Sequence, residues 1–162
     1  MKIRKYFLNC FLLLIPIIIW NITLIDYLPI GYNSDIFDKD IPKFVSYIEN
    51  FIRFLLFALP IFMILSLKSR LQKIGFLTYL IGLILYFSSW HIMIIMPESN
   101  WSQGIIGFMA PAYTTIIFFV GIALIGNKAF FKFPHLSLIY ICMSILFVIS
   151  HSVHAYLVFM RL

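Results

Sequence analysis

Long apolar segments alternate with short polar ones along the whole chain. Five apolar segments stand at about 6–25, 45–67, 74–96, 105–125 and 136–160. Each has about 20 to 25 residues, and a helix of that length crosses the roughly 30 Å of a membrane's hydrocarbon core. We therefore predict an all-α integral membrane protein, a bundle of five transmembrane helices that forms a single transmembrane domain over residues 1–162.

The amino-acid composition supports this prediction. Of the 162 residues, 63% are hydrophobic and only 11% are charged, whereas a soluble domain is about 45–50% apolar. So few charged residues cannot cover a water-facing surface, which excludes a soluble protein. The first segment begins like a signal peptide, but no small-x-small cleavage site follows it. We therefore expect it to remain as the first helix.

Basic and acidic residues separate to opposite sides of the predicted helices. If the N-terminus is cytoplasmic, the inner segments contain no acid and these basic residues: Lys2, Arg4, Lys5, Lys68, Arg70, Lys73, Lys128 and Lys132. This is the positive-inside asymmetry, so we predict a cytoplasmic N-terminus and an extracytoplasmic C-terminus. The net charge of +6 does not indicate nucleic-acid binding, because the basic residues form no stripe interleaved with aromatic ones.

The predicted location is the plasma membrane, as a multi-pass protein, and the bias toward Ile, Phe, Lys and Asn favours a bacterial cytoplasmic membrane. The longest connection, residues 26–44, is acidic and is predicted to cover the outer surface of the bundle. Its motif "DIFDKD" lacks the Gly and Glu of a calcium-binding loop. Cys10 and Cys142 both fall within apolar segments, so neither a structural disulfide nor a cysteine metal site is expected.

Ionisable residues inside the apolar segments are the strongest indication of function. Arg53 lies roughly 10 Å inside the second segment at 1.5 Å per residue, and Glu49, one turn earlier, is predicted to pair with it. By the same rise His91, His151 and His154 lie roughly 8, 13 and 9 Å from the outer ends of their segments. Three helices therefore place ionisable groups in the outer half of the membrane.

The connector after the third segment adds two further residues just above this layer. We therefore predict an outer-leaflet polar site formed by Arg53, Glu49, His91, His151, His154, Trp101 and Glu98. An arginine suits a phosphate or carboxylate head group, and aromatic rings suit an apolar tail. The predicted ligand is an anionic or lipid-like small molecule, a membrane lipid among them, or a partner protein.

Other interpretations of the same residues stay open. His91, His151 and His154 could supply three nitrogen ligands to zinc or copper, and His91 facing either of the others could ligate haem. Either cofactor would favour an intramembrane enzyme, although HxxH is a weak pattern and no serine-elbow or HExxH motif is present. Alternatively the polar residues only satisfy one another, in a sensor, accessory or immunity protein that acts by binding another protein. The sequence does not decide the cofactor, the oligomeric state or whether the protein is an enzyme.

Overall fold

The computed structural model describes residues 7–131 and 134–162, and it is helical throughout, with no β-strand in those ranges. Five helical segments are long and apolar enough to span a membrane: Cys10–Tyr27, Lys43–Phe62, Arg70–Ile95, Ile105–Ile125 and Leu136–Phe159. This confirms the all-α fold class and supports a multi-pass membrane protein. Five residues named in the predictions lie outside the described ranges: Tyr6, the start of the first predicted segment, and Lys2, Arg4, Lys5 and Lys132, which belong to the predicted inner charges.

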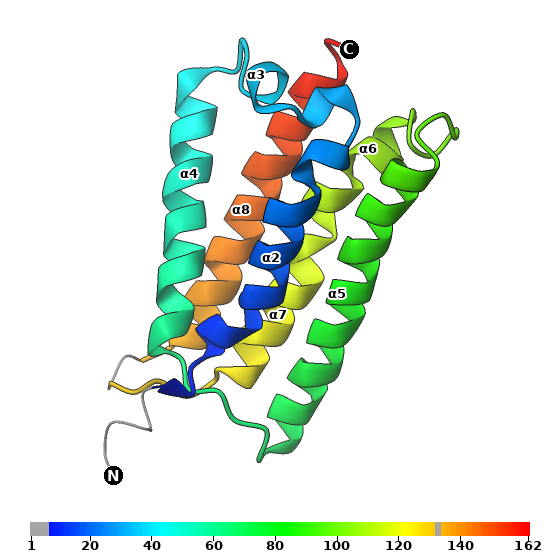
Figure 1. Cartoon of the computed structure of the whole chain (residues 1–162). Helices are drawn as coiled ribbons and strands as arrows, with labels where there is room; N and C mark the ends of the chain where they lie inside the picture. Colours follow the sequence, from blue (N-terminus) through cyan, green and yellow to red (C-terminus); the bar gives the residue numbers. More distant parts are fainter. Residues whose placement is uncertain (1–6, 132–133) are drawn as a thin grey trace.

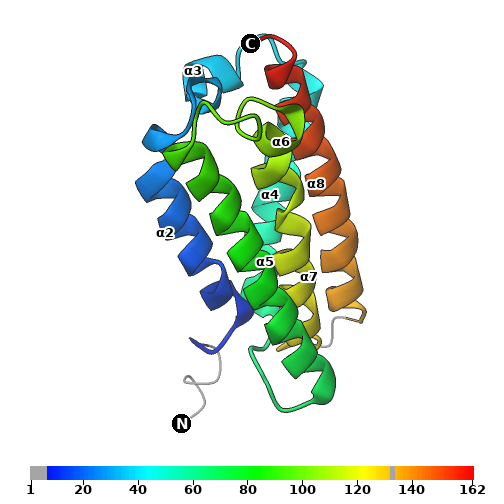
Figure 2. The same ribbon diagram turned by 90° about the vertical axis from the view of Figure 1, so that its right-hand side faces the viewer.

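The long helices run side by side and form one bundle (Figures 1 and 2). The elements in chain order are η1 (Cys10–Leu13), α2 (Ile15–Leu24), η2 (Ile25–Tyr27), η3 (Ile30–Tyr32), α3 (Ser34–Phe37), α4 (Lys43–Ala58), η4 (Leu59–Phe62), α5 (Arg70–Ile95), α6 (Ile105–Tyr113), α7 (Thr115–Ile125) and α8 (Leu136–Phe159), where η denotes a short 3₁₀ helix. The first span thus combines η1, α2 and η2, the second combines α4 and η4, and the fourth combines α6 and α7.

The closest packing in the bundle is between α5 and α7. At Gly82 an added Cβ would lie 2.4 Å from the backbone nitrogen of Phe118, and at Gly121 it would lie 2.5 Å from that of Tyr79. Only glycine allows two backbones to approach so closely, which is how small residues join helices in a membrane. The helices α5 and α7 are therefore packed backbone to backbone, and α7 also packs against α8.

The second span differs from its predicted extent, since it ends at Phe62 rather than at Leu67. Residues 63–65 instead bond to backbone groups of two other segments: Cys10 N–H donates to the Met63 carbonyl at 2.9 Å, and Leu65 N–H to the Leu8 carbonyl at 3.1 Å. Ile64 N–H donates to the Lys128 carbonyl at 2.8 Å. These bonds satisfy backbone groups that would otherwise need a further turn of helix. They also tie together the chain segments that precede α2, follow α4 and follow α7.

Charged residues separate to the two ends of the bundle. At one end, called here the basic end, lie the start of α5 with Lys68, Arg70 and Lys73 and the turn after α7 with Lys128. Residues 7–10 lie at the same end (Figure 1). The opposite end, called here the acidic end, holds α3, the α5–α6 connector and the C-terminus. Five acids, Asp26, Asp35, Asp38, Asp40 and Glu98, outnumber the three basic residues there, Lys39, Lys43 and Arg161. The structure thus collects at one end all the described basic residues that were predicted to share a side.

The connection between the first two spans folds over the acidic end as a cap, defined here as residues 28–42. The Tyr32 hydroxyl donates to the Phe108 carbonyl oxygen of α6, and burial, the largest cause, raises the pKa of the Tyr32 phenol, so that it stays a donor. A guanidinium N–H of Arg161 donates to the Ile36 carbonyl at 3.3 Å. The cap is thus attached to α6 and to the end of α8.

Candidate functional site

The helix α4 presents two different faces. Its buried residues, Val45, Glu49, Ile52 and Leu56, recur every three or four positions and lie on the side that packs against α8. The opposite side is aromatic and exposed, with Phe44, Tyr47, Phe51 and Phe54. Helical spacing therefore carries Glu49 into the bundle together with the apolar residues of its face. Only 2% of the Glu49 side chain is exposed, so its carboxylate must be satisfied by neighbouring side chains.

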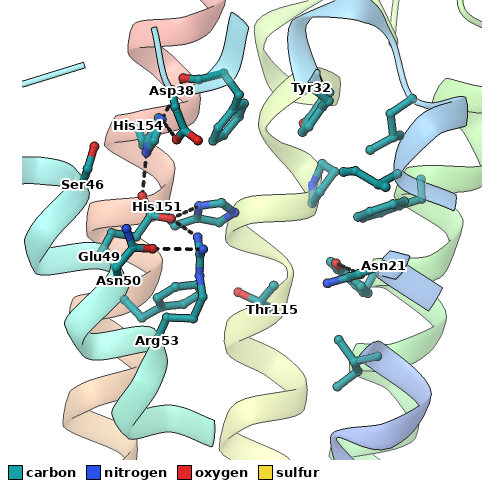
Figure 3. Close-up of a pocket in the computed structure, with 18 of the residues that line it drawn as sticks. Asn21, Tyr32, Asp38, Ser46, Glu49, Asn50, Arg53, Thr115, His151 and His154 are labelled. Carbon is teal, nitrogen blue, oxygen red and sulfur yellow. Dashed lines mark hydrogen bonds and ion pairs between the residues drawn. The ribbon is translucent and has the colours of Figure 1, made fainter. Parts of the chain in front are cut away.

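Three side chains from two helices surround that carboxylate (Figure 3). His151 Nδ1 lies 3.0 Å from Glu49 Oε1, and His154 Nδ1 lies 2.7 Å from Oε2. A guanidinium N–H of Arg53 also donates to Oε1. We call Glu49, Arg53, His151 and His154 the Glu49 cluster. Four of the seven side chains predicted for the polar site are thus brought together, including the Glu49–Arg53 pair expected from their spacing.

The hydrogen bonds of His154 determine its charge. Its Nδ1 faces the Glu49 carboxylate, and its Nε2 lies 3.0 Å from the Phe37 carbonyl oxygen of the cap. A carbonyl only accepts, and an ionised carboxylate only accepts, so both ring nitrogens donate and the ring is an imidazolium. Asp38 Oδ1 lies 3.8 Å from Nε2 at the water-exposed rim. Within the cluster, Arg53 and His154 therefore contribute two positive charges against the single negative charge of Glu49, and Asp38 at the rim places a second negative charge near His154.

Aromatic rings pack against the cluster on two sides. Phe147 stacks on His151 with ring centroids 5.2 Å apart, and the Arg53 guanidinium carbon lies 5.7 Å from the centroid of the same ring. On the cap side, Phe37 stacks on His154 at 4.4 Å. These contacts fix the orientation of the imidazoles and lower the local dielectric constant, so charge–charge interactions here are stronger than in water.

The Glu49 cluster forms one wall of a cavity of about 930 Å³ that extends from the cap into the bundle. The lining includes both polar and apolar side chains. The polar ones are Asn21, Asp26, Tyr32, Asn33, Asp38, Ser46, Asn50, Thr115, Tyr86 and the Glu49 cluster, and the apolar ones are Ile17, Ile25, Leu28, Ile30, Phe37, Phe57, Trp90, Pro111, Phe118, Phe119 and Phe147. The volume is within the range of small-molecule binding sites.

The opposite wall of the cavity belongs to α2 and α5. There the Tyr86 hydroxyl donates to Asn21 Oδ1 at 2.6 Å. Figure 3 shows Asn21 across the cavity from Arg53, with Thr115 of α7 between them. Sequence reasoning missed Asn21, although a single asparagine within the apolar run "IIIWNITL" is itself a sign of an inward-facing polar group.

The remaining predicted residues do not join the Glu49 cluster and do not line the cavity. His91 is exposed and borders a shallow hollow on the α2–α5 surface with Trp20, Phe87, Ser88 and Ile92. Glu98 is exposed in the α5–α6 connector and accepts from the Gln103 side chain at 2.7 Å, and Trp101 of the same connector is 40% exposed. The sequence predicted how far His91 lies along its helix, but not which way its side chain points. Trp90 faces the cavity, and the next position along the helix turns His91 away from it.

The structure does not bring His91, His151 and His154 together as ligands of a metal ion or a haem. Among residues 7–131 and 134–162, no group of three or more His, Cys, Asp or Glu side chains is arranged to hold a metal ion. Both nitrogens of His154 are engaged, with Glu49 and with Phe37, so its ring has no lone pair to offer. His91 lies outside the cluster and cannot complete a pair with His151 for haem.

The fold and the site together define the class of protein: an all-α bundle of five apolar, membrane-length helices with a buried ionic cluster in the wall of an internal cavity. Comparisons with family models, with curated proteins and with solved structures find no match to this chain. The function must therefore be inferred from the chemistry of the cavity.

Proposed function

We propose that this protein is a small plasma-membrane protein that binds an anionic amphiphile in the cavity beside the Glu49 cluster. The observation that carries the proposal is Arg53. It stands in an apolar helix, yet 42% of its side chain is exposed, and it lines the cavity. An intramembrane arginine that faces a cavity is costly unless that cavity receives polar or anionic groups.

The charge balance around Arg53 favours an anion. With His154 as an imidazolium, the cluster has one positive charge in excess of Glu49. The acids that also line the cavity, Asp26 and Asp38, are exposed at the rim, where water and salt screen their field. The apolar part of the lining, which includes Phe57, Phe118 and Phe119, suits a hydrocarbon chain.

The charge distribution along the bundle also supports an orientation. We propose that the basic end is cytoplasmic and the acidic end, with the cap and the cavity mouth, is extracytoplasmic. A ligand would then reach the cavity from the outer leaflet or from outside the cell.

This orientation predicts the reactivity of single engineered cysteines in intact cells. Asp35→Cys, exposed in α3, will react with a membrane-impermeant maleimide, whereas Lys68→Cys, exposed at the basic end, will react only after permeabilisation. The unmodified chain, with Cys10 buried and Cys142 exposed on the apolar helix α8, is the control for background labelling. Labelling of Lys68→Cys but not Asp35→Cys in intact cells would reverse the orientation.

The ligand proposal predicts a loss of affinity in Arg53→Gln. We expect this variant to bind dodecyl phosphate and dodecanoate at least tenfold more weakly, about 1.4 kcal/mol or more, because the anion loses its positive partner. Native mass spectrometry from neutral-detergent micelles, with increasing probe concentration, measures the bound fraction. Arg70→Gln is the matched control, since Arg70 is exposed at the basic end and lies outside the cavity lining.

Three outcomes would contradict the proposal. If neither anionic probe binds the unmodified protein, or if Arg53→Gln binds them as tightly, Arg53 does not hold an anion. Inorganic phosphate, which lacks a chain, should bind far more weakly than dodecyl phosphate because it cannot use the apolar lining. Equal binding of both would exclude an amphiphile as the ligand.

A further inference from the structure

The two sides of the cavity belong to different parts of the bundle. The helix α2 is held to α5, through the Tyr86–Asn21 hydrogen bond and through Trp20, whose ring stacks on Phe87 with centroids 4.2 Å apart. The helix α4 instead packs against α8. Residues of both α2 and α4 line the cavity, so it lies between them, as Figure 3 shows. A ligand in the cavity therefore has one wall on α4 and another on α2.

The α2 wall offers hydrogen-bond donors. Because Asn21 Oδ1 accepts from the Tyr86 hydroxyl, the amide is oriented and its NH₂ group keeps two donors. Within the described part of the chain, this NH₂ group has no hydrogen-bond partner, and the Asn21 side chain lines the cavity. The neighbouring Thr115 is not a donor to the cavity, since its hydroxyl donates to the Ala112 carbonyl at 2.7 Å.

The α4 wall offers donors as well. The Arg53 guanidinium donates to Glu49 and, at 3.2 Å, to Asn50 Oδ1, which leaves part of its five N–H groups for a ligand. Donors thus approach the cavity from two opposite directions, Arg53 on one side and Asn21 on the other (Figure 3).

This arrangement distinguishes between anions. A carboxylate has two oxygens in one plane, pointing away from its chain, and it is well satisfied by a single arginine. A phosphate monoester has three terminal oxygens in a tetrahedral arrangement, so it can accept from two walls at once. Building on the proposed function, we propose that the ligand is an alkyl or lipid phosphate whose head bridges Arg53 of α4 and the Asn21 amide of α2.

The proposal is tested by head-group selectivity. The unmodified protein will bind dodecyl phosphate at least tenfold more tightly than dodecanoate, the two probes having the same chain. Asn21→Asp keeps an oxygen for the Tyr86 hydroxyl but replaces the NH₂ donors by a negatively charged acceptor. We expect it to lose at least tenfold in affinity for dodecyl phosphate, and with it the preference for phosphate.

Controls separate this effect from misfolding. Asn100→Asp makes the same chemical change at an exposed position of the α5–α6 connector and should retain the preference. Tyr86→Phe removes only the hydroxyl that orients the Asn21 amide, so it should weaken phosphate binding less than Asn21→Asp does. Thermal unfolding of each unliganded variant checks that the bundle is intact.

The outcomes distinguish the two proposals. If dodecyl phosphate and dodecanoate bind equally, and Arg53→Gln weakens both, the anionic-amphiphile function stands and the phosphate bridge is wrong. Retention of the phosphate preference in a folded Asn21→Asp variant also overturns the bridge. If neither probe binds the unmodified protein, the proposed function itself fails.

Discussion

Glu49→Ala will destabilise the bundle more than any other single substitution at the site. The side chain is only 2% exposed, and it accepts hydrogen bonds from Arg53, His151 and His154. Its removal leaves positive groups facing one another across a buried space. Breaking a buried ion pair by removing one partner costs about 3–5 kcal/mol. For a chain of this size that corresponds to a melting temperature lower by about 10 °C.

Thermal unfolding in a neutral detergent, followed by circular dichroism, measures this effect. Glu98→Ala removes the same charge at an exposed site, where Glu98 has a single hydrogen bond to Gln103, and should change the melting temperature little. The double variant Glu49→Leu, Arg53→Leu removes both members of the pair. It should recover part of the loss, because apolar replacement of a complete buried pair is often tolerated. Equal melting temperatures for Glu49→Ala and Glu98→Ala would show that the cluster does not stabilise the fold.

His154→Ala will loosen the cap around Phe37, although the bonds of Tyr32 and Arg161 remain, whereas His151→Ala will not. His154 links Glu49 to the Phe37 carbonyl, and its ring stacks on the Phe37 ring. His151 bonds to Glu49 but makes no hydrogen bond to the cap within the described residues, and only its ring approaches Phe37, at 6.2 Å. The two substitutions therefore remove rings of the same type from the same helix, but only His154→Ala removes a hydrogen bond to the cap.

Hydrogen–deuterium exchange of the cap amides measures the difference. The N–H groups of Ile36, Phe37 and Lys39 are bonded within the cap, to Asn33 and Ile36 carbonyls. We expect their exchange to be at least tenfold faster in His154→Ala and nearly unchanged in His151→Ala, because local protection follows the free energy of local opening. Faster cap exchange in both variants, to the same extent, would show that the cluster acts as a unit and that the Phe37 contact is not decisive.

The sequence predicted the bundle well because membrane spanning imposes a strong and simple constraint. Apolar length alone located all five helices, and the fourth span has the predicted bounds of 105–125. The second span was predicted to reach Leu67 because residues 63–67 are also largely apolar. Hydropathy cannot reveal that Met63 and Ile64 bond to distant backbone groups at the basic end.

The site was predicted in part, and the reason lies in what helical rise measures. Helical rise placed Glu49, Arg53, His151 and His154 at similar levels of their helices, where the structure brings them into contact, and the i, i+4 spacing predicted the Glu49–Arg53 pair. Direction around a helix axis depends on how the helices pack, so the sequence left open whether His91 faces the same group, and in the structure it lies outside it. The cap contact was beyond sequence reasoning for another reason: the Phe37 group that bonds to His154 is a backbone carbonyl, which every residue has.

The backbone bonds at the basic end have a mechanical consequence. Residues 8–10, just before α2, are bonded directly to residues 63–65, just after α4, while nearer the acidic end the same two helices stand on opposite sides of the cavity. The helices α2 and α4 are therefore held together at the basic end and stand apart near the acidic end. If a ligand changes the distance between α2 and α4, the change is smallest at the basic end and greatest at the cavity mouth. In the proposed orientation that mouth is extracytoplasmic, so the cap is the element that a bound ligand would move most.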